Sequence, residues 1–197
     1  MATDIVKLRT PMMEAFLPKG GIARYASYLG LAVIGSILLW VSAKTQVPFF
    51  PVPMTLQTLA ILLIAATCGF RLGLAMIGLY MIEGMLGLPV FSSTPERGIG
   101  MAYMVGPTAG YLVGFVVATG FVGWFAQRGA VDSSLKLFAV MFVGAALILA
   151  LGFVWLATFM GAQAAFAAGV APFMLGELFK VSIAALLVPA ASKLLKR

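Results

Sequence analysis

Apolar residues in this chain form long runs without charge, separated by short polar or proline-containing segments. No charged residue lies between Arg24 and Lys44, within residues 98–127, or within residues 137–176. A helix that crosses a membrane needs about 20 apolar residues, so the last run can hold one complete spanning helix and the loop after it. Because such runs recur along the chain, they predict several spanning helices rather than one anchor or a signal peptide.

Prolines, glycines and charges between the runs divide them into six predicted spans. Arg71 marks a tight turn after the second span, Pro89 stops the third, and Pro172 favours the first turn of the sixth. Residues 127–136 form a polar link, and residues 161–171 a loop of small residues. We therefore expect an all-α integral membrane protein with a cytoplasmic lead over residues 1–23 and one six-helix domain over 24–197. The predicted spans are residues 24–43, 54–70, 72–88, 104–126, 137–160 and 172–192.

The segment between the first two spans has an unusual composition, with three prolines in residues 48–53. Prolines at this density exclude a helix, so the segment is predicted to be an extended loop. Phe49 and Phe50 lie between these prolines and are costly to expose to water. We expect the loop to fold back over the protein as a lid.

Basic residues are distributed unequally over the two ends of the six-span model. Lys44 and Arg97 lie on one side, and ten lie on the other: Lys7, Arg9, Lys19, Arg24, Arg71, Arg128, Lys136, Lys193, Lys196 and Arg197. Cytoplasmic segments of membrane proteins carry the excess of Lys and Arg, so both termini are predicted to be cytoplasmic. The net charge of +7 is dispersed over helix ends, which favours a topological role over nucleic-acid binding.

Composition agrees with a membrane protein and narrows the possible chemistry. The chain is 62% hydrophobic and 10% charged, whereas soluble domains are about 45–50% apolar and about 25% charged. With no histidine and only Cys68, it has no intrachain disulfide and no His- or Cys-based metal site. We find no phosphate-binding loop and no G-x-S-x-G motif, and the two aspartates lie in predicted cytoplasmic segments. We expect no cofactor and no catalysis, and a small-molecule transporter fits better than a lipid-acting membrane enzyme.

Three ionisable residues lie inside predicted spans: Glu83 in the third, and Glu177 and Lys180 in the sixth. A charge in hydrocarbon is costly, so such residues are candidates for function. Glu83 and Glu177 each lie five residues from the outer helix end, about 7–8 Å deep at 1.5 Å per residue. Lys180 follows one turn deeper on the same face as Glu177, and Arg97 lies in the outer loop above. These four residues predict a polar site, although Glu177 and Lys180 alternatively serve only to neutralise each other.

Four sequence blocks resemble the BioY family of biotin-uptake proteins in order and spacing. They are VPFFPVPMTLQTL at 47–59, GMLGLPVF at 84–91, GPTAGY at 106–111 and GELFK at 176–180. The resemblance runs from about Arg24 to the C-terminus. It implies the fold of an S component, the substrate-binding subunit of an energy-coupling-factor (ECF) vitamin transporter, in a bacterial cytoplasmic membrane. It also implies a partner module of two ABC ATPases and a transmembrane coupling subunit.

The resemblance places the polar ligand contacts on Glu83, Arg97, Glu177 and Lys180. Carboxylates there would accept from the ureido N–H groups of biotin, and the two cations would donate to its oxygens. Further substrate-binding candidates are Thr55, Gln57, Phe50 and Phe91. S components often carry Ala-x-x-x-Ala in the first helix for docking, where this chain has Ala32-x-x-x-Ser36. A different vitamin, or another small molecule, is the alternative ligand.

Overall fold

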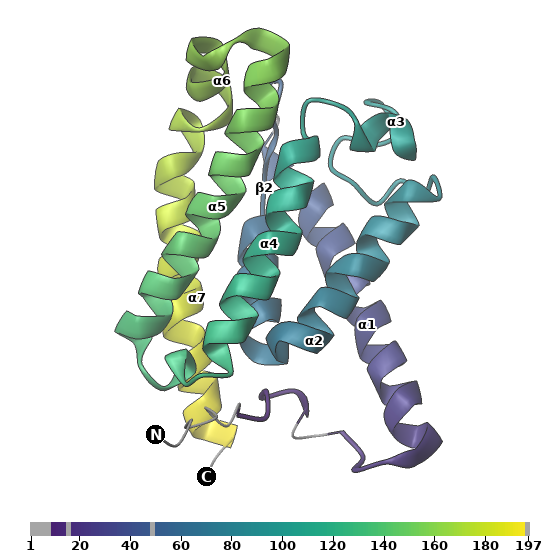
Figure 1. Ribbon diagram of the computed structural model, residues 1–197, viewed down its shortest axis with the longest axis vertical. Helices are drawn as coiled ribbons and strands as arrows, with labels where there is room; N and C mark the ends of the chain where they lie inside the picture. The colour runs from purple at the N-terminus through teal and green to yellow at the C-terminus, as the bar shows by residue number, and fades with distance from the viewer. Residues whose placement is uncertain (1–8, 15–16, 48–49, 196–197) are drawn as a thin grey trace, which may run out of the picture.

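The computed structural model describes residues 9–14, 17–47 and 50–195, which form a bundle of long helices and one short hairpin (Figure 1). Five helical stretches in this part of the chain are long and apolar enough to cross a membrane. The helices are α1 (Gly21–Lys44), α2 (Gln57–Met85), α3 (Met101–Met104), α4 (Ala109–Ala126), α5 (Ser134–Met160), α6 (Ala162–Gly169) and α7 (Met174–Leu195). The strands are β1 (Gln46–Val47) and β2 (Met54–Thr55).

The stretch α2 contains two helices, which supply the second and third predicted spans. The chain reverses at Gly69, whose φ of 71° and ψ of −170° are not helical. A positive φ is readily adopted by glycine, and a side chain at Gly69 would meet Pro11 at 2.6 Å. The turn is therefore at Gly69 and not at Arg71 as predicted. The third helix also ends at Met85, before Pro89. With this reversal the predicted all-α, six-span architecture is confirmed.

Helices α4 and α5 approach each other closely through glycines. A Cβ atom added at Gly110 would lie 2.4 Å from the carbonyl oxygen of Leu151, and one at Gly114 would lie 2.8 Å from the Cα of Ile148. Small residues allow membrane helices to pack at this distance. Helix α4 begins at Ala109, five residues later than predicted, because a separate turn, α3, precedes it.

Two segments outside the predicted spans are ordered by local structure or by packing. Residues 161–171 form helix α6 and the 3₁₀ turn Ala171–Phe173, because five of the eight residues in α6 are alanines, the best helix former. Part of the N-terminal lead is held against the bundle: the Arg9 amide donates to the Gln127 carbonyl at 2.8 Å, and the Met13 amide to the Thr67 carbonyl at 3.1 Å. The prediction of a loop was therefore wrong for residues 162–169.

The proline-rich segment is bounded by the antiparallel pair β1–β2, in which Gln46 pairs with Thr55. Pro51, Val52 and Pro53 are buried, so this part of the loop folds back over the bundle as predicted. Phe50 does not, because 85% of its surface is exposed. Phe49 lies outside the described residues.

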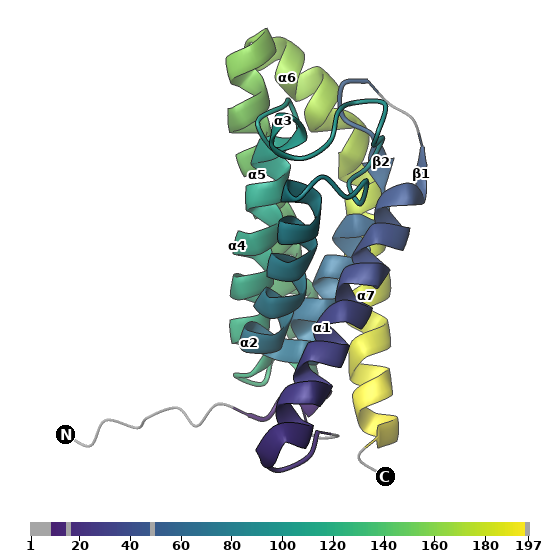
Figure 2. The ribbon, with the colours of Figure 1, turned by 90° about the vertical axis from the view of Figure 1, so that its right-hand side faces the viewer.

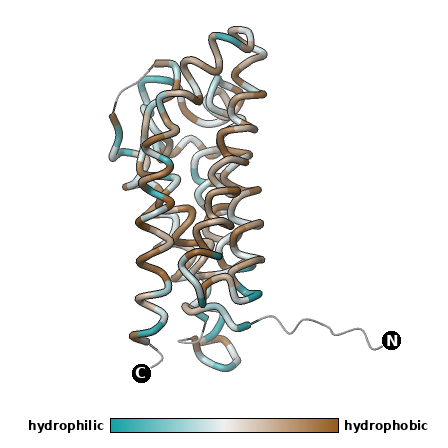
Figure 3. Tube along the Cα trace, turned by 90° about the vertical axis from the view of Figure 1, so that its left-hand side faces the viewer, coloured by the Kyte–Doolittle hydropathy of each residue, from teal (hydrophilic) through white to brown (hydrophobic). Residues whose placement is uncertain are grey.

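The start of α1 and the end of α7 lie at one end of the molecule, and the hairpin, α3 and α6 lie at the other (Figures 1 and 2). Hydrophobic residues cover most of each long helix, while hydrophilic residues gather towards the two ends (Figure 3). This distribution is typical of a bundle that crosses a bilayer. Which end faces the cytoplasm stays a prediction from the basic residues.

Candidate small-molecule site

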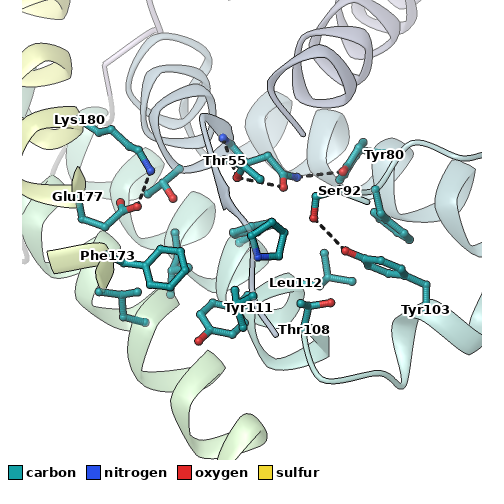
Figure 4. Close-up of a pocket in the computed structure, with 18 residues that line it drawn as sticks. Thr55, Tyr80, Ser92, Tyr103, Thr108, Tyr111, Leu112, Phe173, Glu177 and Lys180 are labelled. Carbon is teal, nitrogen blue, oxygen red and sulfur yellow. Dashed lines mark hydrogen bonds and ion pairs between the residues drawn. The ribbon is translucent and has the colours of Figure 1, made fainter. Parts of the chain in front are cut away.

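A partly enclosed cavity of about 50 Å³ lies between α2, α4, α5 and α7, below the loops that carry Val52 and Phe91 (Figure 4). Its walls combine aromatic rings with hydroxyl, amide and charged groups. The lining residues are Val52, Pro53, Thr55, Gln57, Thr58, Tyr80, Phe91, Ser92, Tyr103, Thr108, Tyr111, Leu112, Phe115, Ile148, Leu149, Phe173, Glu177 and Lys180. The wall is thus assembled from segments that are distant in the sequence.

Glu177 and Lys180 supply the charge of this cavity. The Lys180 Nζ donates to Glu177 Oε1 at 2.7 Å, and the two side chains are only 8% and 10% exposed. They lie three residues apart on α7 and therefore on one face, as the sequence predicted. The second carboxylate oxygen, Oε2, is buried and has no hydrogen-bond partner among the described residues. A buried acceptor without a hydrogen-bond partner lowers the stability of the fold. A ligand with N–H groups would donate to this oxygen.

A hydrogen-bonded chain crosses the cavity wall from α2 to the loop at 86–100. Thr55 Oγ1 contacts Gln57 Oε1 at 3.3 Å, and Gln57 Nε2 donates to the Tyr80 hydroxyl at 2.9 Å. The Tyr80 hydroxyl in turn donates to the Val90 carbonyl at 3.1 Å. Gln57 and Tyr80 are both buried, so this chain holds the beginning of α2 to the loop without competition from water.

The aromatic part of the wall is centred on Phe91, which is 1% exposed. Its ring stacks on Tyr103 at a centroid distance of 4.8 Å and meets the edge of Tyr80 at 5.3 Å. Ser92 Oγ lies 3.0 Å from the Tyr103 hydroxyl. A Cβ at Gly84 would lie 2.0 Å from the Phe91 ring, so the glycine makes room for this aromatic group. This part of the wall therefore combines aromatic rings with the hydroxyl groups of Tyr80, Tyr103 and Ser92.

The structure brings together five of the eight predicted site residues: Thr55, Gln57, Phe91, Glu177 and Lys180 all line the cavity. The other three are not among its lining residues. The Ser36 hydroxyl of α1 donates to Glu83, which places that carboxylate at the α1–α2 contact. Arg97 donates to the Pro51 carbonyl and lies over the Phe50 ring, 5.4 Å from its centroid. Arg97 therefore connects the loop after α2 to residues 50–51 of the proline-rich loop.

Sequence reasoning missed the tyrosines of the site, Tyr80, Tyr103 and Tyr111. A tyrosine in a membrane helix carries a hydroxyl that needs a partner when buried, and this signal was available. Tyr111 donates to the Gly169 carbonyl at 2.7 Å, and so connects α4 to α6. What the sequence could not show is that the three rings converge on one cavity.

A larger groove of about 380 Å³ lies between α5, α6 and α7 and shares Leu149 and Glu177 with the cavity. Its other lining side chains are apolar, and several of them, such as Phe142 and Met174, are more than half exposed. It therefore opens onto the surface that faces lipid. The smaller cavity is the better candidate for a polar ligand, because polar groups from several elements converge there. No cluster of residues that could hold a metal ion occurs in the described ranges.

These features define a class: a polytopic helical membrane protein with a small polar and aromatic cavity near one end of the bundle. The chain belongs to the BioY family, whose family model matches residues 13–197. It is 34% identical over 164 residues to the biotin transporter BioY of Thermotoga maritima, covering 83% of this chain and 94% of the relative. It is 35% identical over 162 residues to the probable biotin transporter BioY of Pyrococcus horikoshii, covering 82% and 94%.

A solved structure shares the fold. The crystal structure of the S-component for biotin from an ECF-type ABC transporter superposes with a TM-score of 0.77 at 18% sequence identity. The match covers 88% of this chain and 95% of the other. At this identity the likeness establishes the fold, and it confirms the predicted S-component architecture.

Proposed function

We propose that the cavity binds biotin and that the protein captures this vitamin for uptake, as the S component of an ECF-type transporter. The observation that carries the proposal is the unpartnered, buried Oε2 of Glu177 beside Lys180 at the cavity wall. The names of the family relatives, which are biotin transporters, support the choice of ligand. Because the relatives are transporters, we expect transport without covalent chemistry, and not a lipid-acting enzyme.

Biotin has the complementary chemistry for these groups. Its ureido ring offers two N–H donors, one of which can satisfy Glu177 Oε2, and an oxygen that can accept from Lys180. The fused rings have apolar faces that suit the Phe91, Tyr80 and Tyr103 wall. The Glu177–Lys180 pair has no net charge, so it matches a polar but neutral ring. The carboxylate tail is then directed towards the outer loops, where Arg97 lies.

A cavity of about 50 Å³ is smaller than the roughly 300–1,000 Å³ of common ligand sites. Binding therefore requires the wall to move outwards. The element best placed to move is the proline-rich loop around Phe50, which is 85% exposed, while the pairing of Gln46 with Thr55 holds the base of this loop. We propose that this loop is a lid that opens to admit biotin and closes over it.

The energy for transport would come from a separate ECF module, because the sequence contains no phosphate-binding loop. Ala32 and Ser36, the match to the family's docking motif, are 7% and 1% exposed and belong to the face of α1 that contacts α2. The motif is therefore not available to a partner in this arrangement. We propose that a coupling subunit docks on the outward face of α1, where Ile34 is 63% exposed.

The decisive experiment is a calorimetric titration of the purified protein with biotin, with thiamine and riboflavin as competitors. We expect saturable binding of biotin and displacement by neither competitor. Tighter binding of another vitamin would assign the chain to a different substrate. Turnover of lipid by the purified protein in detergent would instead favour an enzyme.

A further inference from the structure

Lys44 at the end of α1 makes contacts that its position at a helix C-terminus does not explain. Its Nζ donates to the Thr94 carbonyl at 2.7 Å, to Thr94 Oγ1 at 3.0 Å and to the Phe91 carbonyl at 3.1 Å. A lysine that only complements the helix dipole would lie near the last carbonyls of its own helix. This ammonium instead bonds a loop about 50 residues away in the sequence.

The acceptors of Lys44 belong to the segment that forms the aromatic wall of the cavity. Phe91 and Ser92 line the cavity, and Thr94 Oγ1 also donates to the Phe91 carbonyl at 2.7 Å. Lys44 therefore closes a small network in which the Phe91 carbonyl accepts from both Lys44 and Thr94. A charged donor makes stronger hydrogen bonds than a neutral one, and this network holds the backbone that presents the Phe91 ring.

The residues directly after Lys44 hold a second segment of the cavity wall. The Leu56 amide donates to the Thr45 carbonyl at 3.1 Å, and Gln46 pairs with Thr55 in the β1–β2 hairpin. Thr55 and Gln57 follow on that side and line the cavity. Ser93 Oγ also contacts Gln46 Oε1 at 3.3 Å. Residues 44–46 are thus bonded both to the Phe91–Thr94 segment and to residues 55–56.

We propose that Lys44 is a positioning residue for the ligand site: it holds the Phe91–Thr94 segment at a set distance from the Thr55–Gln57 segment. It does not line the cavity and need not touch the ligand. The same contact joins the cavity wall to α1, a helix that otherwise packs mainly on α2. A displacement of α1 would therefore act directly on the Phe91 wall. This inference rests on the proposed function, because its effect is measured on the binding of biotin.

The test compares Lys44→Met with Lys44→Arg and with Lys136→Met, a matched change at an exposed lysine in the first turn of α5. Biotin affinity is measured by calorimetry and the melting temperature without ligand by tryptophan fluorescence. Loss of charged hydrogen bonds should weaken biotin binding about tenfold or more in Lys44→Met. Lys44→Arg retains a charged donor and should stay within about threefold of wild type, and Lys136→Met should bind like wild type.

A distance measurement separates positioning from a general loss of stability. Spin labels at Val47 and Ile99, both about half exposed, are introduced with Cys68 replaced by alanine. Lys44→Met should broaden their distance distribution, whereas Lys136→Met should not. Wild-type affinity in Lys44→Met, or an unchanged distribution in a variant that binds weakly, would overturn the inference.

Two further results distinguish a failure of the proposed function, or of folding, from a failure of the inference about Lys44. If the unmodified protein does not bind biotin, the proposed function fails, whatever Lys44 does. If Lys44→Met does not fold, Thr94→Val replaces it, because that change removes one acceptor of Lys44 and one donor to Phe91. Thr94→Val should weaken binding by about threefold to tenfold, and wild-type binding by this variant would overturn the inference.

Discussion

Glu177 and Lys180 form a buried ion pair whose stability depends on both partners being present. Taking two charges out of water is expensive, and the pair recovers the cost only when the remaining donors and acceptors are satisfied. Here one carboxylate oxygen has no partner in the described structure. Under the proposed function, the pair serves recognition at some cost to the stability of the free protein.

Removing either partner should weaken biotin binding. We expect Lys180→Met and Glu177→Leu each to lower the affinity about tenfold or more, since hydrogen bonds to charged groups contribute about 1.5–3 kcal/mol. The double variant should lose much less than the sum, because each single change leaves an uncompensated buried charge at about 3–5 kcal/mol. Glu177→Asp keeps the carboxylate and should retain most binding. Calorimetry measures the affinities, with Lys193→Met on the same helix as the control. If both single variants bind like wild type and only melt earlier, the pair is structural.

Glu83 should behave differently from Glu177, although both are membrane-embedded carboxylates. Its contact is with Ser36 on α1, and it does not line the cavity. Glu83→Leu should therefore lower the thermal stability by about 1 kcal/mol, the value of one lost hydrogen bond, and leave biotin affinity within about twofold. Parallel melting and titration experiments distinguish the two effects. A tenfold loss of affinity with normal stability would place Glu83 in the ligand site.

At the scale of elements, the structure combines a closely packed helix pair, α4 and α5, with a proline-rich loop whose Phe50 is exposed. Helices α4 and α5 touch through Gly110 and Gly114, whereas Phe50 in the proline-rich loop is 85% exposed. Regions with few buried contacts open most readily. We propose that the first part is a rigid frame and that the second supplies the movement that a small cavity needs.

The close contact of α4 and α5 predicts a stability effect without a direct ligand effect. Gly114→Val would place a side chain within 2.8 Å of the Ile148 Cα, and overpacking of this kind typically costs about 1–3 kcal/mol. We expect a lower melting temperature in detergent. Gly120→Val is the control, since a Cβ there meets its nearest neighbour at an ordinary 3.5 Å. Equal melting temperatures for the two variants would show that α4 and α5 separate easily.

The lid predicts a change in mobility on binding. A spin label at the exposed Phe50 should become less mobile when biotin is added, because the closed loop is held by contacts to the ligand and the walls. A label at Leu135, which is 79% exposed at the start of α5, should not respond. Unchanged mobility at Phe50 under saturating biotin would make the loop a static part of the fold.

For the whole molecule, the open question is orientation in the membrane. The start of α1, the link between α4 and α5, and the end of α7 lie at one end of the bundle (Figure 1), and this end carries most of the basic residues. Basic segments remain in the cytoplasm. The ligand site near the other end would then receive biotin from outside.

Reporter fusions test this orientation. A reporter active only in the cytoplasm should function when inserted after Ala130 or fused after Arg197, and it should be silent after Gly161, between α5 and α6. A reporter active only outside should give the reverse pattern. Cytoplasmic activity after Gly161 would show that the bundle is inverted or that the number of crossings is wrong.

Hydropathy determined that this is a membrane protein, because nothing but lipid can cover so many apolar residues, and the prolines, glycines and charges between the apolar runs determined the six spans. Helical periodicity was enough to place Glu177 and Lys180 on one face, since residues three apart on a helix are neighbours in any fold. The BioY blocks indicated Thr55, Gln57 and Phe91, all of which line the cavity. Two predictions from local sequence were wrong. The turn after the second span is at Gly69 and not at Arg71, and the alanine-rich helix α6 occupies a predicted loop.

Only the tertiary structure decided which neighbour each polar side chain meets. Glu83 lies at a depth similar to that predicted for Glu177, but it bonds Ser36 because α1 packs on that side of α2. Tyr80 and Tyr103 join Phe91 because the loop between α2 and α3 folds back over the bundle. A sequence period defines the face of a helix but not the helix that packs against it. The site therefore depends on contacts between distant segments, which local sequence does not specify.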